Sequence, residues 1–236
     1  RVDELIALPS SPLCGPSTTV MALETLQEAL DDQGWDVPVQ EVTGWHSYPL
    51  YQELRGAHIE AFTADRGVDL QDEDTAMLFS AHGTPKHYLE GGSRYQQYCI
   101  DHCQHMKGRL VLDNFFLAYQ NHENRDIPWT EPEVEETVEM LGEEGFERVV
   151  VDPISFVHEQ SETLMELDVE LREEAEQAGL EFHRVPIPYD DDRLATTFAN
   201  VVEPWLGDAD PVEAGFAQCE CRDRPGTMCL NAPHED

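Results

Sequence analysis

The sequence predicts an α/β fold in which parallel strands alternate with helices. Short apolar runs of strand length, such as residues 75–82 and 148–155, are each followed by a longer segment with apolar residues at helical spacing. This alternation favours parallel sheets with helices on both faces. The length of 236 residues is enough for one large or two small domains with real cores.

The order of elements follows from these patterns. The expected strands cover residues 2–9, 37–42, 75–82, 109–120, 148–155 and 182–188. The expected helices cover residues 20–34, 48–65, 93–108, 131–145, 158–178 and 191–206. Residues 207–236 have little periodicity and are rich in Gly, Pro and Asp. We expect a tail that cannot bury a core of its own and needs a cross-link, which its cysteines can supply.

Capping residues support several helix boundaries. Ser17 or Thr18 is a suitable N-cap for the first helix, and Gly34 is a suitable end. Pro132 lies near the first position of the helix at 131–145, whose first turn is acidic. Within the helix at 48–65, we expect Gly56 to break or loosen the helix.

The charge of the chain limits its partners. Forty-nine acidic residues face 14 basic ones, for a net charge of −35. This charge argues against nucleic acids and anionic membrane surfaces as partners. Because the acidic residues are spread throughout, one interpretation is a protein adapted to high salt, which screens the self-repulsion. The chain contains no run of about 20 apolar residues, so no membrane span is expected.

Three carboxylates recur at a spacing of four in the segment after the run at 148–155. In a helix, Glu162, Glu166 and Glu170 would share one face, each about 6 Å from the next. Like charges in this arrangement oppose helix formation by a few tenths of a kcal/mol per pair. A row kept against that cost could receive a cation. Spacing alone favours a solvated acidic face equally.

One histidine has a position typical of ligand sites. His82 ends the apolar run at 75–82, and ligands of open α/β sheets collect at the carboxyl ends of strands. Taken alone, a histidine at a strand end is more often structural. The chain has no G-x-G-x-x-G or G-K-[ST] motif, so nothing suggests a nucleotide.

Three segments together resemble the ferrochelatase family. PISFVHEQSETLMELDVE (153–170) is similar to the family's signature segment, and LFSAHGTPKHYLEGGSRY (78–95) to its SAHG/S-x-P motif and the G-D-x-Y element after it. YQNHENRDIPWTEP (119–132) is a weaker match to Y/W-Q-S…P-W-L-x-P. The segments occur in the family's order, and the resemblance covers most of residues 1–206.

The resemblance implies a chelatase-like fold of two Rossmann-like lobes with a porphyrin between them. Residues 1–44 would finish the first lobe and 45–188 would form the second. Residues 189–206 would return to the first lobe as a helix, and 207–236 would be a Cys-rich tail. The chain begins with Arg, so we expect a fragment in which the first lobe is incomplete.

The family's functional residues map onto this chain one by one. The resemblance implies that His82 accepts pyrrole protons or relays metal, and that Glu162 faces it and binds Fe²⁺ or takes protons. Glu166 and Glu170 would continue from Glu162 as a path for metal or protons. The positions expected to line the porphyrin are Pro128, Trp129 and Phe156.

The chain departs from the family pattern at two places. Gln160 replaces the histidine usual two residues before the active-site glutamate, and an amide cannot titrate. In the third segment, Asn121 and His122 replace the usual Ser and Arg or Lys. These changes place a proton relay and some contacts to porphyrin carboxylates in doubt.

The cysteines suggest a metal site in the tail. The pattern Cys219-x-Cys221-x7-Cys229 resembles the C-terminal cysteines of those ferrochelatases that carry a [2Fe–2S] cluster, which four thiolates hold. The family's fourth ligand comes from the second lobe, so Cys103 is expected, or Cys99. Zinc is the main alternative. The remaining cysteine, Cys14, is expected to be a buried thiol.

The function implied by this resemblance is insertion of Fe²⁺ into protoporphyrin IX or coproporphyrin III in heme synthesis. A non-catalytic porphyrin- or heme-binding protein on the same fold, and a chelatase for another metal, are the alternatives. The expected partners are porphyrin and ferrous iron, and no nucleic acid is expected. The resemblance also allows peripheral contacts with other enzymes of heme synthesis. A cytoplasmic location is expected, with or without peripheral contact with a membrane.

Overall fold

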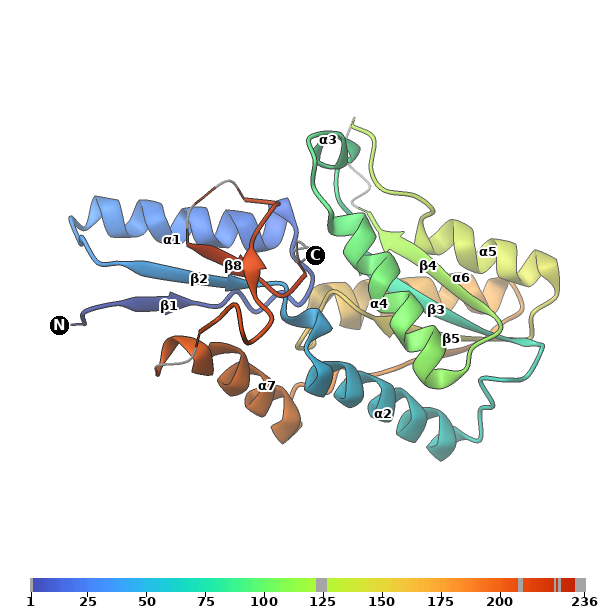
Figure 1. The fold of residues 1–236 in the computed structure, drawn as a ribbon. Helices are drawn as coiled ribbons and strands as arrows, with labels where there is room; N and C mark the ends of the chain where they lie inside the picture. Colours follow the sequence, from blue (N-terminus) through green and yellow to red (C-terminus); the bar gives the residue numbers. More distant parts are fainter. Residues whose placement is uncertain (1, 122–126, 208–209, 223, 225, 232–236) are drawn as a thin grey trace.

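The computed structural model describes residues 2–121, 127–207, 210–222, 224 and 226–231, and its fold is of the predicted α/β class (Figure 1). Two four-stranded sheets lie side by side, with strand orders β1-β2-β8-β7 and β4-β3-β5-β6. We call them the first and the second sheet. Among the described residues, no helix is both long and apolar enough to span a membrane.

The second sheet is entirely parallel. Its strands are β3 (Thr75–His82), β4 (Phe115–Gln120), β5 (Arg148–Pro153) and β6 (Glu181–Arg184). β3 lies between β4 and β5, with His82 opposite Gln120 and Ser80 opposite Pro153. Because all four strands run the same way, their carboxyl ends meet at one edge, where an α/β sheet usually binds ligands.

Helices cover both faces of the second sheet, as the near-continuous apolar strands require. Alternate residues of β3 point to opposite faces. Met77 and Phe79 join one core, with α2 (Pro49–Arg66) and α4 (Tyr95–Leu110). Leu78 joins the other core. That second core also includes residues of α5 (Val134–Glu144), η3 (Glu162–Leu171) and α6 (Arg172–Gln177).

The first sheet contains strands that the sequence analysis did not anticipate. β1 (Leu5–Ala7) and β2 (Val39–Thr43) match expected strands and are parallel. The tail adds β8 (Thr227–Cys229) parallel to β2, and β7 (Ala217–Gln218) antiparallel to β8. In Figure 1 the red tail lies beside α1 and β2 of the blue N-terminal segment. Strands this short carry too little periodicity to be found by pattern.

The helices beside the first sheet are α1 (Met21–Asp32) and α7 (Asp192–Val202). Leu194 and Val201 of α7 pack with Val42 of β2 and Trp45 in one core cluster. Asp191 caps α7, because its carboxylate accepts from the Arg193 amide at 2.8 Å. Short helical turns complete the fold: η1 (Pro16–Val20), η2 (Trp45–Ser47), α3 (Lys86–Glu90) and η4 (Glu203–Trp205).

Two helices differ from expectation. α2 runs unbroken through Gly56. Arg109 of α4 bonds both Glu53 and Glu60, so it braces α2 on either side of that glycine. The segment expected as one α-helix over 158–178 begins instead as the ten-residue π-helix η3 and becomes α-helical only at Arg172. Such wide turns are rare and frequently occur at functional sites.

A buried ion pair joins α2 to β5. Arg55 donates to Asp152, and both side chains are almost completely buried. Arg55 also donates to the Pro153 carbonyl at 3.4 Å. Burial raises the pKa of Asp152, and the neighbouring Arg55 charge opposes that rise. The pair therefore holds α2 against the edge of the sheet from which the signature segment starts.

Replacing Asp152 with Ala would leave the Arg55 charge buried without its partner. We expect the free energy of unfolding to fall by about 3–5 kcal/mol, measured by urea unfolding. Asp65→Ala removes the exposed pair between Arg66 and Asp65 and should change stability by less than about 0.5 kcal/mol. A loss below about 1 kcal/mol for Asp152→Ala would contradict a structural role for the pair.

Candidate active site

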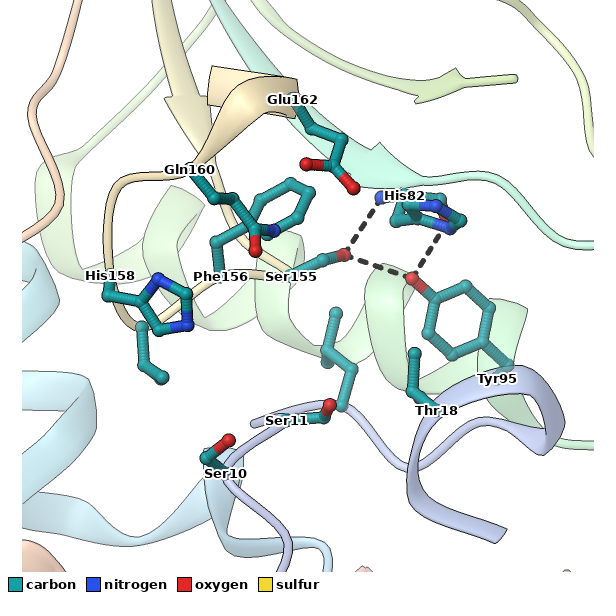
Figure 2. Close-up of a pocket in the computed structure, with 12 residues that line it drawn as sticks. Ser10, Ser11, Thr18, His82, Tyr95, Ser155, Phe156, His158, Gln160 and Glu162 are labelled. Carbon is teal, nitrogen blue, oxygen red and sulfur yellow. Dashed lines mark hydrogen bonds between the residues drawn. The ribbon is translucent and has the colours of Figure 1, made fainter. Parts of the chain in front are cut away.

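A pocket of about 290 Å³ lies at the carboxyl edge of the second sheet (Figure 2). Its walls come from the end of β3, the loop after β5, the start of α4 and the loop between β1 and α1. The lining residues include Ser10, Ser11, Thr18, His82, Tyr95, Ser155, Phe156, His158, Gln160 and Glu162. Two of the residues predicted from the sequence to act in catalysis, His82 and Glu162, thus face the same cavity.

The orientation of the His82 ring defines its chemistry. Its Nδ1 lies 2.7 Å from the Gly83 carbonyl oxygen. A carbonyl oxygen only accepts, so Nδ1 carries the proton and donates it. In the neutral ring the basic nitrogen is therefore Nε2, which can take a proton or bind a metal ion. Phe156 packs edge-on against the ring, with the ring centroids 6.4 Å apart.

Glu162 is the first residue of η3, and its carboxylate lies beside His82 in Figure 2. The side chain is half-buried. Ser161 donates a hydrogen bond to one carboxylate oxygen of Glu162 at 2.7 Å. An imidazole and a carboxylate that converge in one pocket can share the work of metal binding and proton transfer.

Gln120 connects η3 to the sheet, and the sequence analysis did not identify it. It ends β4 and is buried. Its amide nitrogen donates to the Glu162 carbonyl at 3.0 Å and to a Glu166 carboxylate oxygen at 3.2 Å. Its amide oxygen accepts from Ser80 on β3 at 3.0 Å. The available signal was a polar residue at the end of an apolar strand next to the strand that ends in His82.

Arg184 fastens the signature segment on its other side. This β6 residue donates to Glu159 at 2.7 Å and also bonds Asp168, so it holds residues on either side of the start of η3. Glu159 also accepts from the Ile187 amide at 2.9 Å. These contacts lower the pKa of Glu159 despite its partial burial, which alone would raise it. Glu162 thus projects from a backbone anchored at both ends.

The carboxylate row continues differently from the expected path. Glu166 is half-buried, whereas Glu170 is exposed to solvent. Glu166 is one of three carboxylates that interact with Glu135, and the other two belong to Glu133 and Glu174. We call these four the acidic group. Desolvation, together with repulsion from the other three carboxylates, raises the pKa of Glu135 to about 7.

The residues expected to contact porphyrin are only partly brought together. Phe156 lines the pocket, and so does Gln160 at the position usually occupied by histidine. Trp129 is mostly buried and forms a β-bridge with Pro85, and the Pro128 carbonyl accepts from the Lys86 amide at 2.9 Å. Neither Pro128 nor Trp129 is among the lining residues of this pocket.

The third segment contains the second departure from the family pattern. Asn121 donates to the Thr130 carbonyl at 2.8 Å and to Glu133 at 2.9 Å, so it anchors the loop before α5. His122 lies outside the described residues.

Three cysteines from distant parts of the chain form a second site. The Sγ atoms of Cys14, Cys219 and Cys221 all lie within 4.8 Å of one another. Cys229 is buried beside Cys219 and bonds to it. We call these four residues the cysteine cluster. Hydrogen bonds from the other three thiols lower the pKa of Cys219, which favours a thiolate where a cation would bind.

The fourth member of the cluster is a correction to the sequence analysis. Cys103, or alternatively Cys99, was expected to join the tail cysteines, but neither belongs to the group that Cys14 forms with Cys219 and Cys221. Burial raises the pKa of both thiols. Cys14, expected to be a buried thiol, is buried and groups with Cys219 and Cys221 in place of Cys103 or Cys99. Spacing could not reveal this because Cys14 and Cys219 meet only through the tertiary fold.

Close packing and hydrogen bonds fix the positions of the cysteine cluster and of the tail. Gly44 has φ of 70°, and a Cβ there would collide with the Cys229 sulfur. Tyr98 bonds Cys221 at 3.2 Å. Deeper in the tail, Arg222 and Thr227 both bond the buried carboxylate of Glu41 on β2. The tail is thus fixed to the first sheet by a charge network as well as by strand pairing.

Comparison with known proteins identifies the family. The model of the family described as Ferrochelatase matches residues 1–205. The chain belongs to the ferrochelatase family. A ferrochelatase from Synechococcus sp. (strain RCC307) is 35% identical over 212 residues, which are 87% of this chain and 53% of the relative. One from Gloeothece citriformis (strain PCC 7424) is 34% identical, over 79% of this chain and 48% of the relative.

The ferrochelatase relatives are longer than this chain, which spans about half the length of those it matches. The fold has a further likeness among solved structures. CbiX, described as the terminal enzyme of siroheme biosynthesis in denitrifying bacteria, superimposes with a TM-score of 0.58 at 16% identity. That match covers 88% of this chain and 78% of the CbiX chain, and at this identity it supports the chelatase-like fold alone.

The acidic group makes a prediction about pH. The carboxyl of Glu135 should titrate near pH 7 rather than at its ordinary value of 4.5, as followed by the carboxyl ¹³C shift. Because the pKa is raised in the folded state, stability due to this group is full below pH 4.5 and is lost as pH rises through about 7.

Glu166→Gln removes one of the like charges and should shift the Glu135 titration to lower pH. Glu144→Gln, an exposed change at the far end of the same helix, should leave that titration in place. A midpoint near 4.5 in the unmodified chain would show that the four carboxylates do not interact as described.

Proposed function

We propose that this chain forms part of an enzyme that inserts Fe²⁺ into a porphyrin. Membership of the ferrochelatase family supports the reaction class, and the convergence of His82 and Glu162 in one pocket is the observation that carries the proposal. Metal insertion requires that two pyrrole protons leave while the metal ion exchanges water for nitrogen ligands. The reaction transfers no electrons.

The pocket offers groups for each part of this reaction. His82 presents a basic Nε2, which accepts a pyrrole proton or relays the metal ion. Glu162 supplies an oxygen ligand for Fe²⁺ and takes the second proton. The acidic group lies behind Glu162 and is connected to it through Gln120, so it is suited to deliver the cation or remove protons.

The substrate is proposed to be protoporphyrin IX or coproporphyrin III. The pocket of about 290 Å³ is at the lower end of small-molecule sites, which span about 300–1,000 Å³, so it would hold the reacting part of a macrocycle. Phe156 and Gln160 line this part. Contacts with other heme-synthesis enzymes, and a cytoplasmic location with or without contact with a membrane, are parts of the proposal supported by the family resemblance alone.

The cysteine cluster is proposed to hold a [2Fe–2S] cluster. Four buried or half-buried cysteines, among which hydrogen bonds lower the pKa of Cys219, fit the four-thiolate donor set of such a cluster, and they also fit zinc. When bound, the [2Fe–2S] group would be a redox-sensitive cross-link between the tail and the loop after β1. It would take no part in metal insertion.

The activity can be tested under anaerobic conditions. The purified protein receives Fe²⁺ with protoporphyrin IX or coproporphyrin III, and loss of free porphyrin fluorescence reports insertion. His82→Ala and Glu162→Gln should each lower kcat by about 100-fold or more, because each removes a proton acceptor. Glu170→Gln is the matched control on the same helix and should retain activity, since Glu170 is exposed.

Three outcomes are informative. Unchanged turnover for Glu162→Gln would refute its role. Tight porphyrin binding without insertion would favour a non-catalytic binding protein, and Gln160→His would then be the first change to make. Faster insertion of Co²⁺ or Ni²⁺ in a competition assay would indicate a chelatase for another metal.

The cysteine cluster has its own test. We expect the anaerobically purified protein to contain iron, acid-labile sulfide and visible absorption. Cys14→Ser should abolish that absorption, whereas Cys103→Ser should retain it, because among the described residues Cys14, and not Cys103, groups with Cys219 and Cys221. The reverse pattern would restore Cys103 as the fourth ligand. Stoichiometric zinc without visible absorption would show that the site is a zinc site.

A further inference from the structure

The backbone of His82 is held by side chains from two other elements. On one side, β3 pairs with β4 as far as His82 itself. On the other side, the register with β5 ends at Ser80, and the Ile154 amide makes a last bond to the Ser80 carbonyl at 2.9 Å. Beyond that point, Ser155 from the loop after β5 and Tyr95 from the start of α4 bond the His82 backbone.

The three groups form a closed ring of hydrogen bonds. The His82 amide donates to the Ser155 hydroxyl at 2.9 Å, and the Tyr95 hydroxyl donates to the His82 carbonyl at 2.8 Å. The two hydroxyls are 2.9 Å apart. Tyr95 has only one hydroxyl proton, and the carbonyl takes it, so Ser155 must donate to Tyr95. Within this ring each residue thus donates once and accepts once, and the Cys99 side chain is a further hydrogen-bond partner of Tyr95.

We propose that Tyr95 and Ser155 are positioning residues that set the direction of His82 Nε2 through this closed ring. The ring of hydrogen bonds fixes the peptide groups on both sides of the His82 Cα. The bond from Nδ1 to the Gly83 carbonyl then fixes the orientation of the imidazole. The proposal rests on the proposed function, because it assigns Nε2 a part in metal insertion.

Packing around Tyr95 supports this role. Its side chain is only 5% exposed, and burial keeps its hydroxyl protonated by raising its pKa well above the ordinary value. A Cβ at Gly15 would come within 3.0 Å of the tyrosine ring, so the backbone of the η1 loop lies directly against it. The tyrosine ring is therefore held in place on the side facing Gly15, and its hydroxyl has little freedom to leave the His82 carbonyl.

A closed ring predicts a particular mutational pattern. Removing either hydroxyl breaks two of the three bonds and leaves the remaining one without its neighbours. Tyr95→Phe and Ser155→Ala should therefore each reduce kcat for Fe²⁺ insertion by about 10–100-fold with little change in the porphyrin KM, as expected for a misdirected catalytic group. The kcat of the double variant should be no more than about threefold below that of the less active single variant, because both changes disrupt the same ring of hydrogen bonds.

A second measurement does not depend on activity. Amide hydrogen exchange of His82, followed by NMR on the whole chain, should accelerate in both single variants because its acceptor is lost or loosened. Ser155→Thr keeps a hydroxyl at this position and should restore both slow exchange and turnover. Tyr119→Phe is the matched control: Tyr119 is buried on β4 opposite Ala81 and its hydroxyl is not part of the ring.

The outcomes separate the inference from the proposed function. If the unmodified protein inserts no metal while His82 exchange responds as described, the function is wrong and the ring stands. If the unmodified protein is active but exchange and kcat are unchanged in Tyr95→Phe and Ser155→Ala, the inference is overturned. It is also overturned if the two single effects multiply in the double variant.

Discussion

The parallel pairing of β3 with β4 and β5 is the constraint on which the site depends. It places the ends of three strands at one edge, and each end or the loop after it contributes a group: His82 from β3, Gln120 from β4 and Ser155 after β5. An antiparallel partner would carry these groups to the opposite edge. The pocket is thus a consequence of strand direction before any side chain is considered.

The signature segment is shaped by what surrounds it. η3 starts where Gln120 bonds the Glu162 carbonyl on one side and Arg184 bonds Glu159 on the other. These contacts favour a wide π-helical turn at a place where sequence spacing alone indicates an α-helix. The same contacts explain why Glu166 turns toward the sheet and the acidic group while Glu170 remains in solvent. A spacing of four residues does not distinguish the two.

Much of the fold could be predicted from the sequence, because long apolar strands and amphipathic helices have strong periodicity. The strand ending in His82 and its neighbour at 148–155 are examples, whereas the range 109–120 contains a strand only from Phe115 onward. The tail strands could not be predicted, since β7 and β8 are two and three residues long and depend on β2 for their pairing. The break predicted at Gly56 does not occur, because Arg109 on another helix bonds residues of α2 on either side of this glycine.

Some residues of the site could be predicted from the sequence, and others could be found only in the structure. His82 and Glu162 were predicted through the family motifs, and the structure places both in one pocket. Gln120, Arg184 and the pair of Tyr95 and Ser155 were missed, because their roles depend on contacts between segments far apart in the chain. Cys14 was missed for the same reason: it meets Cys219 only after the tail has joined the first sheet.

The central claim is that His82, in the pocket it shares with Glu162, has its proton on Nδ1 and an unprotonated Nε2. The most direct test is ¹⁵N NMR of the His82 imidazole at a pH where the ring is neutral. The account predicts a proton on Nδ1, bonded to the Gly83 carbonyl, and a basic Nε2 whose resonance shifts when porphyrin and Zn²⁺ are added. A proton on Nε2, with no response to metal, would contradict the account.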